Sequence, residues 1–302
     1  MKKLNYITLT ASLTALTAQA TVVTDGLIKE LNADTIGAVT DGSTWTGTGV
    51  SAGLNDKEFA GGDLTRATAT VYGGNTSSVF AHTLTKGAFE RAGTLGATTS
   101  FLTGTTLSVE LWINTGFTGT PTTSHTIFET GGATKGMSIT LGDNGTGTNN
   151  TLRFAMKDAS NSEFVDVTLD AVAMANFTND DHHQLAVTYD NVNNMSVYID
   201  GELAGSNIAA GVIDWDGTSI AGFWGQDGSG VGAYAITLDD DIGNTSSNGR
   251  GQGSIAVFRQ YSGVLTAEQV QQNYASTIPE PGTTALLAGC FVLTSIMVRR
   301  RR

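Results

Sequence analysis

The chain has 302 residues and a formal net charge of −12, with 16 Lys and Arg residues against 28 Asp and Glu residues. Such an acidic chain repels nucleic acid phosphates, which argues against a nucleic-acid-binding role. The one cysteine, Cys290, lies in an apolar C-terminal stretch, so the domain before it has no disulfide, thiolate metal site or cysteine nucleophile. The 38 glycines and only 3 prolines suit strands joined by glycine-rich turns, and we expect an all-β fold.

Residues 1–20 have the form of a secretory signal peptide. Lys2 and Lys3 supply a positive start, residues 4–17 are modestly apolar, and Ala18-Gln19-Ala20 is a small-x-small cleavage site. The alternative is an amphipathic first helix, but no helical apolar stripe follows these residues. We therefore expect an exported chain whose mature form starts near Thr21.

Residues 21–276 are expected to form one β-domain, although the first part of this range has only weak strand patterns. Its candidate strands, in chain order, cover residues 25–34, 67–72 and 78–84. Residues 107–114 give a much clearer signal, because Leu, Val and Ile residues alternate there with Ser, Glu, Trp and Asn. This period of two predicts a strand with one buried face.

Further strands follow at regular intervals, separated by Gly, Asn and Asp turns. They are expected at residues 127–129, 137–141, 152–156, 183–189, 195–199 and 254–261. The pair at 183–189 and 195–199 predicts an antiparallel meander. Asp200-Gly201 then predicts a two-residue hairpin turn of type I′, which needs positive φ at both positions. One helix is expected, with Thr266 as its N-cap and continuing to Tyr274.

Three segments, in this order, resemble the LamG-like, concanavalin A-like jelly-roll family. They are Leu107–Asn114, then His183–Asp190 with Val197–Leu203, and finally Ile255–Tyr261 with Leu265–Val270. The resemblance implies a two-sheet antiparallel jelly-roll sandwich of about a dozen strands over residues 21–276. It also implies a module that binds carbohydrate or protein ligands.

The C-terminal residues 277–302 combine three features of a sorting signal. Pro279-Glu280-Pro281 is followed by the uncharged residues 282–298, just long enough to cross a bilayer, and then by four arginines at 299–302 that would stay on the cytoplasmic side. This tail resembles the PEP-CTERM signal of Gram-negative bacteria. The resemblance implies a transmembrane helix, an exosortase as partner and transient anchoring in the inner membrane. The destination would be the cell surface or the extracellular matrix, and a simple tail anchor is the alternative.

Loss of both terminal segments would make the protein still more acidic. Lys2, Lys3 and the four arginines are six of the sixteen basic residues, and without them the charge is roughly −18. Such a surface keeps the domain soluble and attracts divalent cations.

We expect no enzymatic activity. Some relatives of this jelly roll are glycoside hydrolases with a Glu-x-Asp-x-x-Glu strand, and no such motif occurs here. Glu163-Phe-Val-Asp166 has the wrong spacing, and Asp200-Gly-Glu202 lies in a turn. His182 and His183 are adjacent on a strand and point to opposite faces, so they cannot chelate one metal together. We expect one of these rings to be packed and the other solvated.

The remaining candidate residues concern ligands. Asp239, Asp240 and Asp241 lie in a Gly/Asn/Ser-rich loop, and several carboxylates on a flexible loop suit Ca²⁺, with an ordinary solvated loop as the alternative. Trp112 and Trp224 are candidates for stacking on sugar rings. Trp112 lies opposite the apolar face of its strand, which places it either on a ligand surface or in a second core layer.

Together these features predict an exported, non-enzymatic binding module that acts on exopolysaccharide, surface glycans or surface proteins, with Ca²⁺ as a candidate cofactor. One alternative is a structural component of an exopolysaccharide matrix without a specific ligand. The other is a glycan-active hydrolase.

Overall fold

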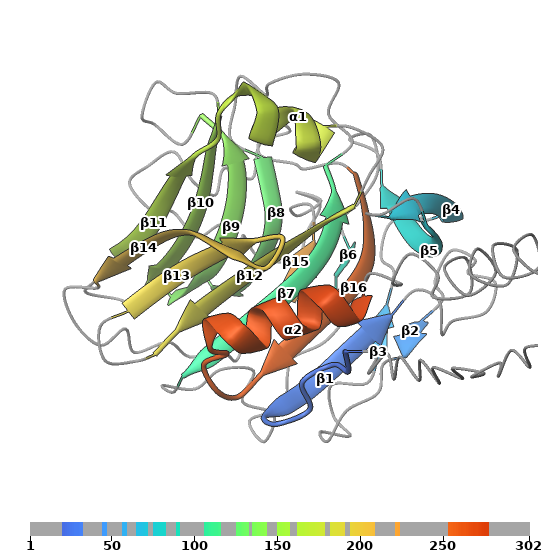
Figure 1. Ribbon diagram of the computed structural model, residues 1–302, viewed down its shortest axis with the longest axis horizontal. Coiled ribbons are helices and arrows are strands. Elements are labelled where there is room, and N and C mark those ends of the chain that lie inside the picture. The colour runs from blue at the N-terminus through green and yellow to red at the C-terminus, as the bar shows by residue number, and fades with distance from the viewer. Residues whose placement is uncertain are drawn as a thin grey trace, which may run out of the picture.

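The computed structural model describes residues 20–32, 44–46, 56–58, 65–71, 75–82, 89–90, 106–115, 125–132, 135–143, 150–157, 162–178, 182–190, 194–208, 221–223 and 253–277. Two antiparallel sheets face each other across a common core, with one helix at an end of the sandwich and one helix on an outer face (Figure 1). The expected all-β fold of two packed sheets is confirmed.

The first sheet has eight strands in the order β14-β13-β12-β7-β16-β5-β4, with β1 also paired to β16. Its strands are β1 (Leu27–Asn32), β4 (Thr65–Val71), β5 (Asn75–His82), β7 (Leu107–Asn114), β12 (His183–Tyr189), β13 (Asn194–Ile199), β14 (Glu202–Ile208) and β16 (Gly253–Tyr261). The central strand β7 is therefore flanked by β12 and β16, two strands from the second half of the chain.

The second sheet has six strands in the order β11-β10-β9-β8-β15-β6. Its strands are β6 (Phe89–Glu90), β8 (His125–Gly132), β9 (Lys135–Gly142), β10 (Thr151–Lys157), β11 (Ser162–Thr168) and β15 (Ala221–Phe223). A separate pair joins β2 (Thr44–Thr46) to β3 (Asp56–Glu58). The described strands of these sheets pair antiparallel, as in meanders and Greek keys.

Alternating apolar residues of both sheets build the core between them. The inward set of β7 packs with the corresponding residues of β9, β10, β12 and β13, and Phe128 meets Phe258 with ring centroids 5.6 Å apart. Each fully buried Leu, Ile, Val or Phe contributes about 1.5–3 kcal/mol. The period-two pattern thus identified the strands because one face of each strand enters this core.

Helix α1 (Ala171–Thr178) closes one end of the sandwich between β11 and β12 (Figure 1). Asp170 caps it, accepting hydrogen bonds from the backbone N–H groups of Val172 and Ala173 at 2.9 and 2.8 Å. Phe177 is buried in the core, and its carbonyl accepts bonds from both the backbone and the hydroxyl of Thr115. The expectation of a single helix was therefore wrong.

Helix α2 (Ala267–Thr277) lies across the outer face of β7, β12 and β16 (Figure 1). The expected cap is confirmed: Thr266 Oγ1 accepts from the N–H of Gln269, whose side chain accepts from the N–H of Thr266, forming a capping box. The helix runs three residues beyond the predicted end. Because α2 covers it, all eight residues of β7 are buried, so the expectation of one buried face was wrong.

The predicted hairpin turn is also confirmed. Asp200 and Gly201 have φ angles of 51° and 83°, the positive values that a type I′ turn demands. Gly201 lies against α2, where a Cβ would stand 3.3 Å from the Cβ of Tyr274. The turn residue therefore serves both the hairpin and the packing of α2.

Among the described helices, neither is long and apolar enough to cross a membrane. The expected transmembrane segment at 282–298 and the motif Pro279-Glu280-Pro281 lie outside the described residues, as does most of the expected signal peptide.

Candidate functional site

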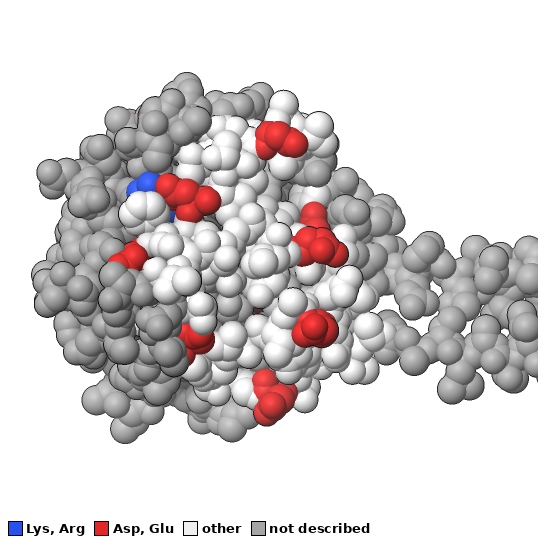
Figure 2. Space-filling view, turned by 60° about the vertical axis from the view of Figure 1, so that its left-hand side comes forward, with Lys and Arg blue, Asp and Glu red and all other residues white. Residues whose placement is uncertain are grey.

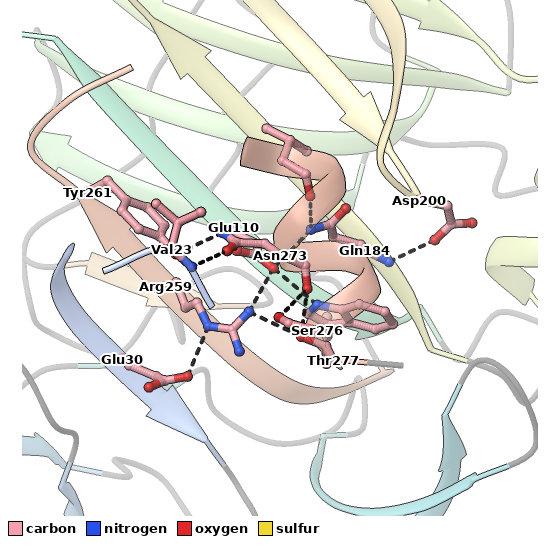
Figure 3. A network of polar contacts seen from close by, with 12 residues as sticks. Val23, Glu30, Glu110, Gln184, Asp200, Arg259, Tyr261, Asn273, Ser276 and Thr277 are labelled. Carbon is pink, nitrogen blue, oxygen red and sulfur yellow. Dashed lines mark hydrogen bonds and ion pairs between the residues drawn. The ribbon is translucent and has the colours of Figure 1, made fainter. Parts of the chain in front are cut away.

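A buried polar network lies between the outer face of the eight-stranded sheet and α2, with Glu110 of β7 at its centre (Figure 3). One carboxylate oxygen, Oε1, accepts from Trp112 Nε1 at 3.2 Å, Gln184 Nε2 at 2.9 Å and Arg259 Nη1 at 2.9 Å. The other oxygen, Oε2, accepts from Asn273 Nδ2 at 2.8 Å. Donors from β12, β16 and α2, all far from β7 in sequence, thus meet on one carboxylate of β7.

Arg259 carries the charge that balances this carboxylate. Its Nε also donates to Glu30 Oε1 at 2.9 Å, so β1 joins the network. Burial opposes the charge of Arg259, but Glu110 and Glu30 outweigh burial, and the pKa of the guanidinium is raised. Burial, and then the negative charge of Glu110, raise the pKa of Tyr261. A buried ion pair is tolerated when its remaining polar atoms are hydrogen-bonded in this way.

The carboxylate at the centre of the network is closed to solvent. Glu110 is fully buried and both of its oxygens are occupied, so it cannot exchange protons with a bound substrate. We assign it a structural role, holding α2 on the sheet.

Trp112 belongs to the same layer. Only 1% of its surface is exposed, and its ring is stacked on Tyr274 of α2 with centroids 5.7 Å apart. Of the two locations that the sequence allowed, the second core layer is the one found. Its ring face is therefore closed to sugar stacking.

The histidine pair is buried as well. His183 Nδ1 lies 2.7 Å from Asp200 Oδ2, and its ring packs on Phe177 with centroids 5.6 Å apart. His182, which directly precedes β12, has its Nε2 2.8 Å from Ser254 Oγ. The two rings have different partners, and the expectation that one of them is solvated was wrong, since both are buried.

A second polar cluster lies on the outer side of the six-stranded sheet, at its edge. The buried guanidinium of Arg153 forms a two-bond fork with Asp166, with Nε–Oδ1 at 2.6 Å and Nη2–Oδ2 at 2.8 Å. The same guanidinium stands 4.2 Å from the ring centroid of Phe164. Phe164 is 37% exposed, so an aromatic ring backed by a fixed cation faces solvent here.

The edges of the two sheets meet beside this cluster. Asn207 of β14 donates from Nδ2 to the carbonyl of Phe164 at 2.8 Å. Leu203 and Ile208 of β14 are exposed apolar residues. We call Phe164, Asp166, Leu203, Asn207 and Ile208 the β11–β14 rim.

Most of the charged groups on the described surface of this side are carboxylates. In Figure 2, acidic residues are scattered over the described part of the face, and the small basic area there adjoins an acidic one. Arg153 and Arg259, the arginines whose side chains the structure describes, are both buried and ion-paired. The described part of the chain therefore presents a surface with little positive charge.

The calcium candidates Asp239, Asp240 and Asp241 and the sugar-stacking candidate Trp224 lie outside the described residues. Within the part that is described, no group of three or more His, Cys, Asp or Glu residues could hold a metal ion.

Two facing antiparallel sheets form a β-sandwich, which is consistent with the expected jelly roll. The chain belongs to the concanavalin A-like lectin/glucanases superfamily, because the Laminin_G_3 family profile matches residues 90–271. Strand β1 and the end of α2 lie outside the matched residues, although both contact the Glu110 network. No curated protein sequence matches the chain.

Similar solved structures include binding domains of botulinum neurotoxins. The receptor binding domain of the C/D mosaic serotype has a TM-score of 0.57 and 14% identity over 84% of this chain and 52% of that chain. A structure of botulinum neurotoxin type C, a toxin whose cell entry depends on interaction with two ganglioside molecules, has a TM-score of 0.51. Its identity is 14% over 84% of this chain and 52% of that chain. A DC binding domain in complex with rat synaptotagmin II has a TM-score of 0.51 and 12% identity over 83% and 51%. The chain thus spans about half the length of these proteins, and the likeness establishes the fold.

Sequence reasoning did not identify Phe164, Arg153 or the network around Glu110. The run Glu163–Asp166 was noted only as an acidic pair with the wrong spacing for catalysis. The spacing of Phe164 and Asp166, two residues apart, indicates that they share one face of a strand. Their partner Arg153 lies on another strand, so the sequence pattern does not include it. Pairing of β10 with β11 was needed to bring the three side chains together.

Proposed function

We propose that the protein is an exported, non-enzymatic binding module that attaches to carbohydrate or protein ligands at the bacterial surface. Membership of a superfamily named for lectins and glucanases supports this proposal. The neurotoxin domains of similar fold also support it, since one is described with gangliosides and another with synaptotagmin II. Carbohydrate and protein are therefore the two ligand classes to test.

The observation that carries the proposal is the β11–β14 rim. Phe164 offers a partly exposed aromatic ring to the apolar side of a sugar ring, and Arg153 holds that ring from behind, with its guanidinium 4.2 Å from the ring centroid. Asp166 and Asn207 supply hydrogen-bonding groups beside it. Because Arg153 is fixed by two bonds to Asp166, the aromatic side chain is held before any ligand arrives, which lowers the entropic cost of binding.

The destination is proposed from the terminal segments. Residues 1–20 direct export, and Pro279-Glu280-Pro281 with residues 282–298 and 299–302 direct sorting by an exosortase. The protein would be held briefly in the inner membrane and then reach the cell surface or the extracellular matrix.

We also propose that the protein has no enzymatic activity and that it binds Ca²⁺. Both oxygens of Glu110 accept hydrogen bonds inside the domain, so this carboxylate is not placed to act as a catalyst, which supports a binding role. Asp239–Asp241 are the residues proposed to bind Ca²⁺, through several carboxylate oxygens.

The test is binding of the purified full chain to an array of neutral, uronate-containing and sialylated glycans, repeated with Ca²⁺ and with EDTA. We expect binding to at least one glycan class and about tenfold weaker binding by Phe164→Ala, the loss expected for an aromatic contact. Asp239→Ala should abolish any difference between Ca²⁺ and EDTA.

Val264→Ala is the matched control, since Val264 is 38% exposed and lies in the loop before α2, away from the rim. It should bind as the wild type does. If no glycan binds under either condition, the carbohydrate version is refuted and a structural matrix role gains support. Release of reducing ends from polysaccharide would instead favour the hydrolase alternative.

A further inference from the structure

The residues that follow the expected signal peptide are held by α2. The backbone N–H of Val23 donates to Asn273 Oδ1 at 2.8 Å, and Gln272 Nε2 donates to the carbonyl of Thr21 at 2.7 Å. The side chain of Val23 is buried in an apolar cluster, whose other members are Ala186, Tyr198, Tyr261, Leu265 and Val270. We call residues 21–23, with Gln272 and Asn273, the N-terminal latch.

The receiving side of the latch is rigid. Besides accepting from Val23, Asn273 donates from Nδ2 to Glu110 Oε2 and to the hydroxyl oxygen of Tyr261, both at 2.8 Å (Figure 3). Its amide group is therefore fixed by the buried network, with Oδ1 directed at the incoming backbone. Because two hydrogen bonds already hold this amide, it loses little further freedom when it accepts the bond from Val23.

Burial falls toward the N-terminus of the latch. Val23 is buried, Val22 is half-buried and Thr21 is exposed. The latch bonds use atoms of Thr21 and of residues after it. Breaking the peptide bond between Ala20 and Thr21 therefore removes none of these contacts.

Two independent observations meet at this bond. The small-x-small motif Ala18-Gln19-Ala20 concerns residue types before the bond, whereas the latch concerns contacts after it. We propose that the Ala20–Thr21 bond is hydrolysed by an endopeptidase that recognises small residues, and that α2 then captures residues 21–23 as the mature N-terminus. This inference rests on the proposed export.

The chemical step is a simple hydrolysis. The amide C–N bond breaks, water supplies the hydroxyl group to the Ala20 carbonyl and a proton to the Thr21 nitrogen, and no cofactor takes part. Capture by α2 then protects the new end, because an exopeptidase can act on residues 21–23 only after the latch opens locally.

The test uses the full chain expressed in a secreting Gram-negative host, with intact-mass and N-terminal peptide analysis of the recovered protein. We expect a single N-terminus at Thr21. During incubation with a nonspecific aminopeptidase, Gln272→Ala should be trimmed roughly fivefold faster than the wild type, the effect of one lost hydrogen bond. Asn273→Ala should be trimmed faster still. Gln271→Ala, an exposed neighbour on the same helix, should behave as the wild type.

An N-terminus after Val23, or trimming of Gln272→Ala at the rate of the Gln271→Ala control, would overturn the latch. If Asn273→Ala fails to accumulate, the milder Gln272→Ala still decides the matter. Retention of residues 1–20 contradicts both the export and the latch. A chain that starts at Thr21 but binds no ligand contradicts the binding function alone.

Discussion

Glu110 is the residue on which the outer layer of the domain depends. Its carboxylate accepts hydrogen bonds from side chains of β7, β12, β16 and α2, and Arg259 supplies the opposing charge. Removing one member of a buried pair leaves the other charge uncompensated, and that cost exceeds the net contribution of the intact pair.

Glu110→Gln should therefore lower the free energy of unfolding by about 3–5 kcal/mol, measured by urea denaturation. The variant keeps the size of the side chain but leaves Arg259 with only Glu30 as a charged partner. Glu202→Gln, at an exposed position of β14, is the control and should change stability by less than about 0.5 kcal/mol. Equal effects of the two variants would show that the network is not stabilising.

Tyr261 makes stability sensitive to alkaline pH. Burial and the charge of Glu110 raise the pKa of its phenol above the ordinary value, so the folded state favours the neutral form. An unfolded tyrosine ionises near pH 10, so this contribution is fully present below about pH 10 and is lost as the pH rises from there toward the folded pKa.

The midpoint of thermal unfolding should accordingly fall above about pH 10. Tyr261→Phe cannot ionise and should fall less steeply over the same range, even though it starts lower because its hydrogen bond from Asn273 is lost. Parallel curves for the two proteins would contradict this explanation.

Among the elements, β7 shows how far sequence patterns reach. Alternation identified it as a strand, because Val109, Leu111 and Ile113 form the inward face. The opposite face carries Ser108, Glu110 and Trp112 and therefore reads as solvent-exposed. It is buried by α2, whose Asn273 is 163 positions further along the chain, and no local pattern encodes that contact.

The two helices differ in the same respect. The start of α2 was predictable because Thr266 and Gln269 form a capping box within four residues. The N-cap Asp170 offered a similar signal for α1, but that helix is only 8 residues long and its sequence is apolar on several sides. Its position is fixed by burial of Met174 and Phe177 in the sandwich, which is a tertiary effect.

At the joined sheet edges, the closeness of β14 to β11 depends on Gly205. A Cβ there would lie 2.8 Å from Val167 Cγ2 and 3.3 Å from Val165 Cγ1, and both are stiff β-branched side chains. Gly205→Ala should destabilise the domain by about 1–3 kcal/mol in urea denaturation, the usual range for overpacking.

Gly263→Ala is the matched control, since a Cβ at that glycine would meet no atom within 4 Å. It should leave stability within about 0.5 kcal/mol of the wild type. If both variants lost the same amount of stability, the close approach of Gly205 to Val165 and Val167 would not be needed for the stability of the domain.

For the whole molecule, the sequence predicted the sandwich but not which surfaces it leaves open. Residues that alternate along one strand are visible locally, so the sheets could be predicted. The rim at Phe164 and the closed position of Trp112 depend on which strands pair and on what covers them. Asp239–Asp241, Trp224 and Pro279–Pro281 stay predictions, because they lie outside the described residues.

The molecule also has two distinct ends. The strands β11 and β14 lie on the left of Figure 1, and the carboxyl end of α2 lies on the right. If the chain is anchored through the segment that follows α2, the proposed ligand-binding rim therefore points away from the anchor.

The network under α2 has a mechanical consequence. Arg259 of β16 donates to the hydroxyl of Thr277 at 3.2 Å, and Asn273, one turn earlier, is bonded to Glu110 of β7. Tension applied to the chain beyond Thr277 therefore passes at once into β7 and β16, which are adjacent strands inside the eight-stranded sheet. A ligand pulled by flow would load the middle of the fold, because the last turn of α2 cannot peel away without breaking its hydrogen bonds to the charged side chains of Glu110 and Arg259.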